Sequence, residues 1–155
     1  MKSKFVYVSY IKTTPEKLWH ALTTPESIKR WWGGGITIKS DWNVGSTWIM
    51  SYADGRVADV GEILESNPPK HMVIKWRNEW NPELKLEGFS RCTFDLEEID
   101  GAVKLTLTHG IDLPNSKFIE AVSVGWPMIL SNLKSFLETG EVVLKERTER
   151  YGTGK

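Results

Sequence analysis

A change of hydrophobic period near residue 110 constrains the fold of this chain more than any other feature of its sequence. From residue 36 to that point apolar side chains tend to alternate with polar ones, as they do along β-strands. Beyond it they recur at steps of three and four, which is the spacing of one face of an α-helix. These later positions are Phe118, Val122, Gly125, Trp126, Ile129, Leu133, Phe136 and Leu137. We predict one amphipathic helix that Asn115 or Ser116 caps and Gly140 ends, about 33 Å long and able to cross an entire sheet.

Seven segments before that helix have the composition of β-strands. They are residues 5–11, 36–39, 46–52, 56–66, 71–78, 88–98 and 103–109. The dipeptides Asp54-Gly55 and Asp100-Gly101 suit tight hairpins because they accept positive φ. From residue 36 to residue 110 we therefore predict strands and turns, in an antiparallel sheet whose successive strands pair.

Two short helices are predicted between the first and second strands. Thr14-Pro15-Glu16 and Thr24-Pro25-Glu26 each place a capping hydroxyl before a proline that suits the first helical position. Gly33-Gly34-Gly35 ends the second of these helices. The order of strand, two helices, six strands and long helix predicts an α+β fold with the helices on one face of the sheet.

Length and charge restrict the class of protein. A chain of 155 residues is the size of one domain, with residues 1–145 as the domain and 146–155 as a solvated tail of alternating charge. The 20 Lys and Arg residues balance 20 Asp and Glu residues, which argues against a nucleic-acid partner. No apolar run has the length of a signal peptide or a membrane span, so we expect a soluble, cytoplasmic protein.

Neither a metal nor another cofactor is predicted. Cys92 is the only cysteine, and no spacing of Cys and His suggests zinc. Gly33-Gly34-Gly35 lacks the Gly-Lys-Ser/Thr sequence that follows a phosphate-binding loop. Asp59 and Glu62 lie on opposite faces of one strand because their separation is odd, so they do not form a pair of catalytic carboxylates.

Tryptophan is the unusual component, with eight residues in the chain. Alternation along the strands and spacing along the long helix place many bulky side chains between sheet and helix. The candidate ligand-binding residues are Trp31, Trp32, Trp48, Met50, Tyr52, Ile74, Trp76, Cys92, Phe94, His109, Trp126, Ile129, Leu130 and Leu133. Either these side chains fill an ordinary core, or they surround a cavity that binds an apolar molecule.

His109 is the candidate for a reacting group, because it lies at a strand end on the inward face and imidazole titrates near neutral pH. The alternative is a neutral histidine that hydrogen-bonds to the backbone or to a neighbouring tryptophan. Cys92 also faces inward, where burial makes a thiol unreactive, so it is interpreted as a core residue.

Several motifs resemble the family of activator of heat shock protein 90 ATPase homologue-like domains, in the START-like (SRPBCC) superfamily. They occur in order from about residue 5 to residue 141. The motifs are residues 14–23, Pro25, Trp31-Trp32-Gly33, Asn67-Pro68-Pro69, residues 105–109, Gly125-Trp126, residues 130–134 and Leu137-Glu138-Thr139-Gly140. The resemblance implies a helix-grip fold, a curved seven-stranded antiparallel sheet around the long C-terminal helix.

The resemblance also frames three hypotheses about function. In the first, the protein binds a small hydrophobic ligand between the sheet and the C-terminal helix, as START-like proteins commonly do. In the second, it is a module that contacts a chaperone, similar to the C-terminal domain of the eukaryotic activator; this chain lacks the part similar to the other domain. In the third, it is an enzyme of the START-like cyclase or hydrolase kind, with His109 as acid or base.

Overall fold

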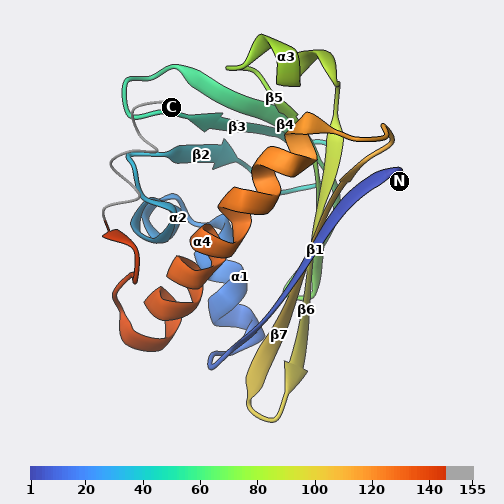
Figure 1. Cartoon of the computed structure of the whole chain (residues 1–155). Coiled ribbons are helices and arrows are strands. Elements are labelled where there is room, and N and C mark those ends of the chain that lie inside the picture. The colour runs from blue at the N-terminus through green and yellow to red at the C-terminus, as the bar shows by residue number, and fades with distance from the viewer. Residues whose placement is uncertain (146–155) are drawn as a thin grey trace.

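The computed structural model describes residues 1–145, so the tail predicted for residues 146–155 lies outside the described residues. Within this part of the chain, one antiparallel sheet of seven strands carries a long helix across one face (Figure 1). The α+β fold predicted from the change of period is confirmed. None of the described helices is long and apolar enough to cross a membrane.

The strands follow the predicted segments closely. They are β1 (Ser3–Ile11), β2 (Thr37–Ser40), β3 (Thr47–Ser51), β4 (Val57–Asn67), β5 (His71–Asn78), β6 (Ser90–Ile99) and β7 (Ala102–Ile111). Their order in the sheet is β1-β7-β6-β5-β4-β3-β2. Strands β2 to β6 each pair with the next strand in sequence, as predicted, while β1 joins the sheet at β7 and forms an edge.

The helices α1 (Pro15–Thr23), α2 (Pro25–Trp32) and α4 (Lys117–Thr139) begin and end at the predicted positions. The prediction of a capping hydroxyl at Thr24 is wrong, because this side chain makes no hydrogen bond to the first turn of α2 and lies 3.2 Å from His20 Nδ1 instead. The Thr14 hydroxyl accepts a hydrogen bond from the backbone N–H of Lys17, and Ser116 does the same for Ile119. Gly140 ends α4 with a φ of 84°, a left-handed conformation that glycine adopts without strain. Helix α2 packs against α4 and β2, so these helices lie on one side of the sheet (Figure 1).

One further helix, α3 (Pro82–Leu86), interrupts the region predicted to contain strands and turns. Asn81 caps it, with the side-chain oxygen accepting from the backbone N–H groups of Glu83 and Leu84. The sequence Asn81-Pro82-Glu83 has the same cap chemistry as the start of α1, with a capping side chain before a proline and a glutamate. The prediction missed this helix because its five residues are too few to show a hydrophobic period.

The absence of a side chain at Gly61 brings two tryptophans together. In the sheet register Gly61 on β4 lies opposite both Trp48 on β3 and Trp76 on β5. The two indole rings contact each other, with their centroids 4.4 Å apart. A Cβ atom at position 61 would lie 1.6 Å from the backbone oxygen of Lys75, so the strands could not keep this spacing with any other residue.

Candidate functional site

Five tryptophans pack against one another between the sheet and the helices. Each of Trp31, Trp32, Trp48, Trp76 and Trp126 is at most 4% exposed. The Trp32 ring lies 5.5 Å from those of Trp31 and Trp126, and Trp76 lies 5.7 Å from Trp126. These are ordinary distances for aromatic pairs in a packed core. The rings therefore occupy much of the space in which the sequence suggested a cavity.

The void that remains among these rings is small. It measures about 20 Å³, which is room for about one water molecule and not for an organic ligand. Its lining includes seven of the candidate residues, namely Trp31, Trp32, Trp48, Ile74, Trp76, Phe94 and Trp126.

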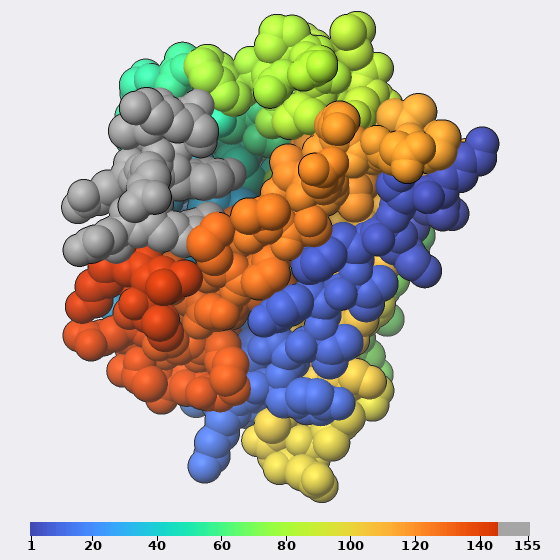
Figure 2. Space-filling model, in the orientation of Figure 1, coloured from blue at the N-terminus to red at the C-terminus, as the bar shows by residue number. Residues whose placement is uncertain are grey.

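A larger cleft opens at one end of the sheet, beside the first half of α4. Its volume is about 350 Å³. The sheet and α2 contribute Trp32, Tyr52, Asp59, Trp76 and Asn78, the α3 region contributes Trp80, Asn81 and Leu84, and α4 contributes Phe118, Ala121, Val122, Gly125, Trp126 and Ile129. Figure 2 shows the first half of α4 (orange) and the α3 segment (yellow-green) next to each other on one face of the molecule.

Five of the candidate residues line this cleft, namely Trp32, Tyr52, Trp76, Trp126 and Ile129. Five others, Met50, Cys92, His109, Leu130 and Leu133, line neither the cleft nor the small void. All five are buried in the core. The structure thus brings the candidate residues together, but it places the open space at one edge of the cluster.

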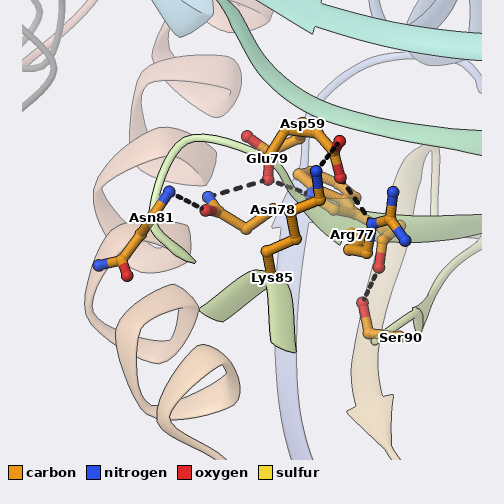
Figure 3. A network of polar contacts seen from close by, with 8 residues as sticks. Asp59, Arg77, Asn78, Glu79, Asn81, Lys85 and Ser90 are labelled. Atoms are coloured by element: carbon orange, nitrogen blue, oxygen red, sulfur yellow. Dashed lines mark hydrogen bonds and ion pairs between the residues drawn. The ribbon is translucent and has the colours of Figure 1, made fainter. Parts of the chain in front are cut away.

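Asp59 lines the cleft, although the sequence analysis did not count it among the candidate ligand-binding residues. It is 6% exposed, and its Oδ2 accepts a hydrogen bond of 2.7 Å from Trp76 Nε1 and a longer one of 3.5 Å from Asn78 Nδ2 (Figure 3). Burial raises the pKa of this carboxyl to about 6, and the negative charge of Glu79 acts in the same direction. The signal available in the sequence was a carboxylate at an inward position of a strand.

Positive side chains near the cleft are engaged with another carboxylate. Glu79 accepts from Arg77 Nε at 2.6 Å and lies 3.1 Å from Lys85 Nζ. These two partners lower the pKa of Glu79. Asn78 in turn accepts from the backbone N–H of Asn81, which ties the end of β5 to the start of α3 (Figure 3).

Aromatic rings also form the mouth of the cleft. Trp80, which is 45% exposed, meets Tyr52 edge to face with the ring centroids 6.0 Å apart. The Arg56 guanidinium lies over both rings, 4.3 Å from Trp80 and 5.0 Å from Tyr52. Arg56 also pairs with Asp54 at 2.7 Å. Burial and the charge of Asp59 raise the pKa of Tyr52, so the phenol is neutral at physiological pH.

His109 belongs to a buried hydrogen-bond chain. Trp126 Nε1 donates to His109 Nδ1 at 3.0 Å, and His109 Nε2 lies 2.9 Å from Ser90 Oγ. The Ser90 hydroxyl donates to the backbone oxygen of Trp76, so its oxygen accepts from His109 and the imidazole is the neutral Nε2–H tautomer. Burial lowers the pKa of His109 to about 3. Both ring nitrogens are occupied, and the geometry gives this histidine no proton-transfer role toward the cleft.

Two other kinds of chemistry find little support in this geometry. Cys92 is fully buried, and burial raises its pKa well above the ordinary value, which keeps the thiol protonated. Among residues 1–145, no group of three or more His, Cys, Asp or Glu side chains is placed to hold a metal ion.

A seven-stranded antiparallel sheet, a long C-terminal helix across its inner face and two short helices after the first strand define a helix-grip domain of the START-like class. The family described as Activator of Hsp90 ATPase homolog 1-like protein matches residues 12–138, and the chain belongs to this family.

Known relatives agree with this assignment. Activator of 90 kDa heat shock protein ATPase homolog 1 from Homo sapiens is 30% identical over 115 residues, which are 74% of this chain and 30% of the human protein. The chain thus spans less than a third of that relative. A crystal structure from Mesorhizobium loti is 25% identical, covers 90% of this chain and 100% of its own, and has a TM-score of 0.76. An HSP90 activator from Plasmodium falciparum is 25% identical with a TM-score of 0.70, covering 87% of this chain and 96% of its own.

Proposed function

We propose that this protein binds a small apolar or aromatic molecule in the cleft between the first half of α4 and the end of the sheet. The observation that carries the proposal is the cleft itself, about 350 Å³ in volume and lined mainly by aromatic and aliphatic side chains. Small-molecule sites have volumes of about 300 to 1,000 Å³ and combine apolar walls with a few polar groups. Asp59, Asn78 and Asn81 are the polar groups here.

The structure of the lining favours binding over simple packing. Trp76 and Trp126 are held by hydrogen bonds to Asp59 and His109, so their rings are fixed before any ligand arrives. A ligand that covers such preorganised apolar surface loses little of its binding free energy to rearrangement of the protein. The driving force is desolvation, about 25 cal/mol for each Å² of apolar surface removed from water.

Intrinsic tryptophan fluorescence tests this proposal, because Trp32, Trp76, Trp80 and Trp126 all line the cleft. Titration with apolar and aromatic compounds, of which 4-phenylbutanol is one, should give a saturable change. Ala121 lies exposed on α4 and lines the cleft, so Ala121→Phe should fill the space and weaken binding about tenfold or more. Val124→Phe, at an exposed position of the same helix outside the cleft, is the matched control.

The proposal is wrong if no compound of a broad apolar set produces a saturable change, or if Ala121→Phe and Val124→Phe bind equally well. Equal binding would place the ligand elsewhere on the protein.

A second candidate function is contact with a chaperone of the 90 kDa heat shock class. The observation in its favour is that the activator from Plasmodium falciparum matches this chain over 96% of its own length. In this case an outer surface would act, and filling the cleft would change nothing. Purified protein should then bind the chaperone and raise its ATPase rate, with Ala121→Phe as active as the natural chain. Failure to bind would exclude this function.

A further inference from the structure

The charge inside the cleft is unusual for a site with apolar walls. Of the described residues that line it, Asp59 alone carries a formal charge. The Asp59 side chain is almost fully buried, and both of its hydrogen-bond donors, Trp76 and Asn78, are neutral groups that bind Oδ2. Within residues 1–145 no donor occupies Oδ1, which leaves that oxygen for a group in the cleft.

No cation of the described chain neutralises this carboxylate. The nearby positive side chains have other partners, since Arg77 and Lys85 pair with Glu79 and Arg56 pairs with Asp54. A buried carboxylate without a counterion is costly, because the aromatic surroundings solvate it poorly. Such groups are typically kept where they bind something.

The surroundings of Asp59 suit a positive charge in particular. Tyr52, Trp76 and Trp80 line the same cleft as the carboxylate, Trp76 donates to it, and aromatic rings attract cations. Two of these rings already hold a cation at the mouth of the cleft, where the Arg56 guanidinium lies over Tyr52 and Trp80.

The opposite wall has no charge at all. Helix α4 contributes only Phe118, Ala121, Val122, Gly125, Trp126 and Ile129 to the lining. An anion would face Asp59, and Arg56, the positive group at the mouth, is already paired with Asp54. A cation with an apolar body would find the carboxylate at one side and the helix at the other.

Building on the proposed function, we propose that the molecule bound in this cleft is an organic cation. Its ammonium group donates to Oδ1 of Asp59 among the rings of Tyr52, Trp76 and Trp80, and its apolar body lies along α4. The ligand class is therefore protonated amines, which keep an N–H donor, with an aliphatic or aromatic group.

This proposal predicts a dependence on pH. Asp59, with a pKa of about 6, is ionised at about pH 8 and largely protonated at about pH 5, so the preference for a cation should fall between these values. The other titratable groups that face it do not change over this range in the same way: Tyr52 stays neutral and Glu79 stays ionised. Arg56 and Asp54 remain paired at the mouth, and the residues of α4 in the lining have no titratable group.

Three probes with one apolar body test the charge directly: 4-phenylbutylamine, 4-phenylbutanol and 4-phenylbutyrate. Titrated at about pH 8 and followed by tryptophan fluorescence, the amine should bind about tenfold or more tightly than the alcohol, and the acid should bind most weakly. Asp59→Asn should remove the advantage of the amine and leave binding of the alcohol nearly unchanged. At about pH 5 the natural chain should also lose most of this advantage.

Glu62→Gln is the matched control, because Glu62 lies three positions along β4 and is exposed outside the cleft. It should keep the full preference for the amine. The proposal is overturned if the amine and the alcohol bind the natural chain equally, or if Asp59→Asn keeps the preference. In either case binding of the alcohol would leave the proposed function standing, whereas saturable binding of none of the three would count against both.

Discussion

Replacing Asp59 by asparagine should make this protein more stable at neutral and alkaline pH. The carboxylate is buried beside two neutral donors, and the asparagine side-chain oxygen can accept the hydrogen bond from Trp76 Nε1 in its place. The new amide group would then occupy the position of Oδ1, toward the cleft. The substitution removes a buried charge while it keeps the shape of the side chain.

The magnitude follows from the two pKa values of this carboxyl, about 6 in the folded chain and an ordinary value of 3.8 in the unfolded one. Because its folded pKa is the higher one, the folded state binds the proton more tightly. The free energy of unfolding is therefore highest below the unfolded pKa and falls as the pH rises from 3.8 to about 6. Above that range the loss is complete and amounts to about 3 kcal/mol.

Urea unfolding of the natural chain and of Asp59→Asn, at a series of pH values, measures this difference. The variant should be more stable by up to about 3 kcal/mol at pH 8, and the difference should vanish near pH 4. Glu62→Gln, at an exposed position of the same strand, is the control for the loss of a charge. Asp95 and Glu65 raise the pKa of His71, so the stability that His71 contributes is also lost as the pH rises. This contribution is the same in the natural chain and in both variants, so it cancels in the differences between them.

The reasoning is refuted if Asp59→Asn is less stable than the natural chain at pH 8, or if the difference does not change with pH. Either result would mean that the protein compensates the buried charge. The expected result would also support the binding experiment. If Asp59→Asn is more stable than the natural chain, its loss of preference for the amine cannot be due to unfolding.

Three further predictions concern the glycines and the buried histidine. Gly61→Ala should lower the free energy of unfolding by about 1 to 3 kcal/mol, because its Cβ would lie 1.6 Å from the Lys75 backbone oxygen and the strands would have to move. Gly125→Ala, whose Cβ meets nothing nearer than 4.0 Å, should instead raise it by up to about 1 kcal/mol in urea unfolding, and the same sign for both would contradict the argument. The imidazole of His109 should stay in the neutral Nε2–H form at pH 5 in nitrogen NMR spectra, since its pKa is about 3; a titration midpoint near 6.5 would disprove its burial. His109→Phe should cost about 2 to 4 kcal/mol in urea unfolding, because it leaves Trp126 Nε1 without an acceptor and removes one of the two partners of Ser90 Oγ.

The sequence predicted the elements of this fold well because their signals are local. Cap residues such as Thr14 and Ser116 act within one turn of the helix that they start. Alternation assigns each side chain of a strand to one face without knowledge of the partner strand. These signals also predicted the inward positions of Trp48 and Trp76, which are both buried.

The cleft could not be predicted in the same way, because alternation gives the direction of a side chain and not the volume that it fills. Trp48 and Trp76 meet because Gly61 lies opposite both of them in the sheet. Whether Trp32 reaches these rings depends on the position of α2 over the sheet. Asp59 has no counterion in part because the nearby Arg77 and Lys85 pair with Glu79 instead. Pairing of this kind is decided by loop geometry after β5, and no spacing in the sequence reports it.

The hydrogen bond between Trp126 and His109 has a consequence for how α4 is seated. Burial of apolar surface has no preferred direction, so an apolar stripe by itself specifies the register of a helix only weakly, and a shift of one turn is about 5.4 Å. Here any such shift would leave the buried indole N–H of Trp126 and an imidazole nitrogen of His109 without a partner, so the bond favours one register of the helix. The first half of α4 forms one wall of the cleft, and the width of the cleft is thereby set from deep within the protein, by a residue that no ligand touches.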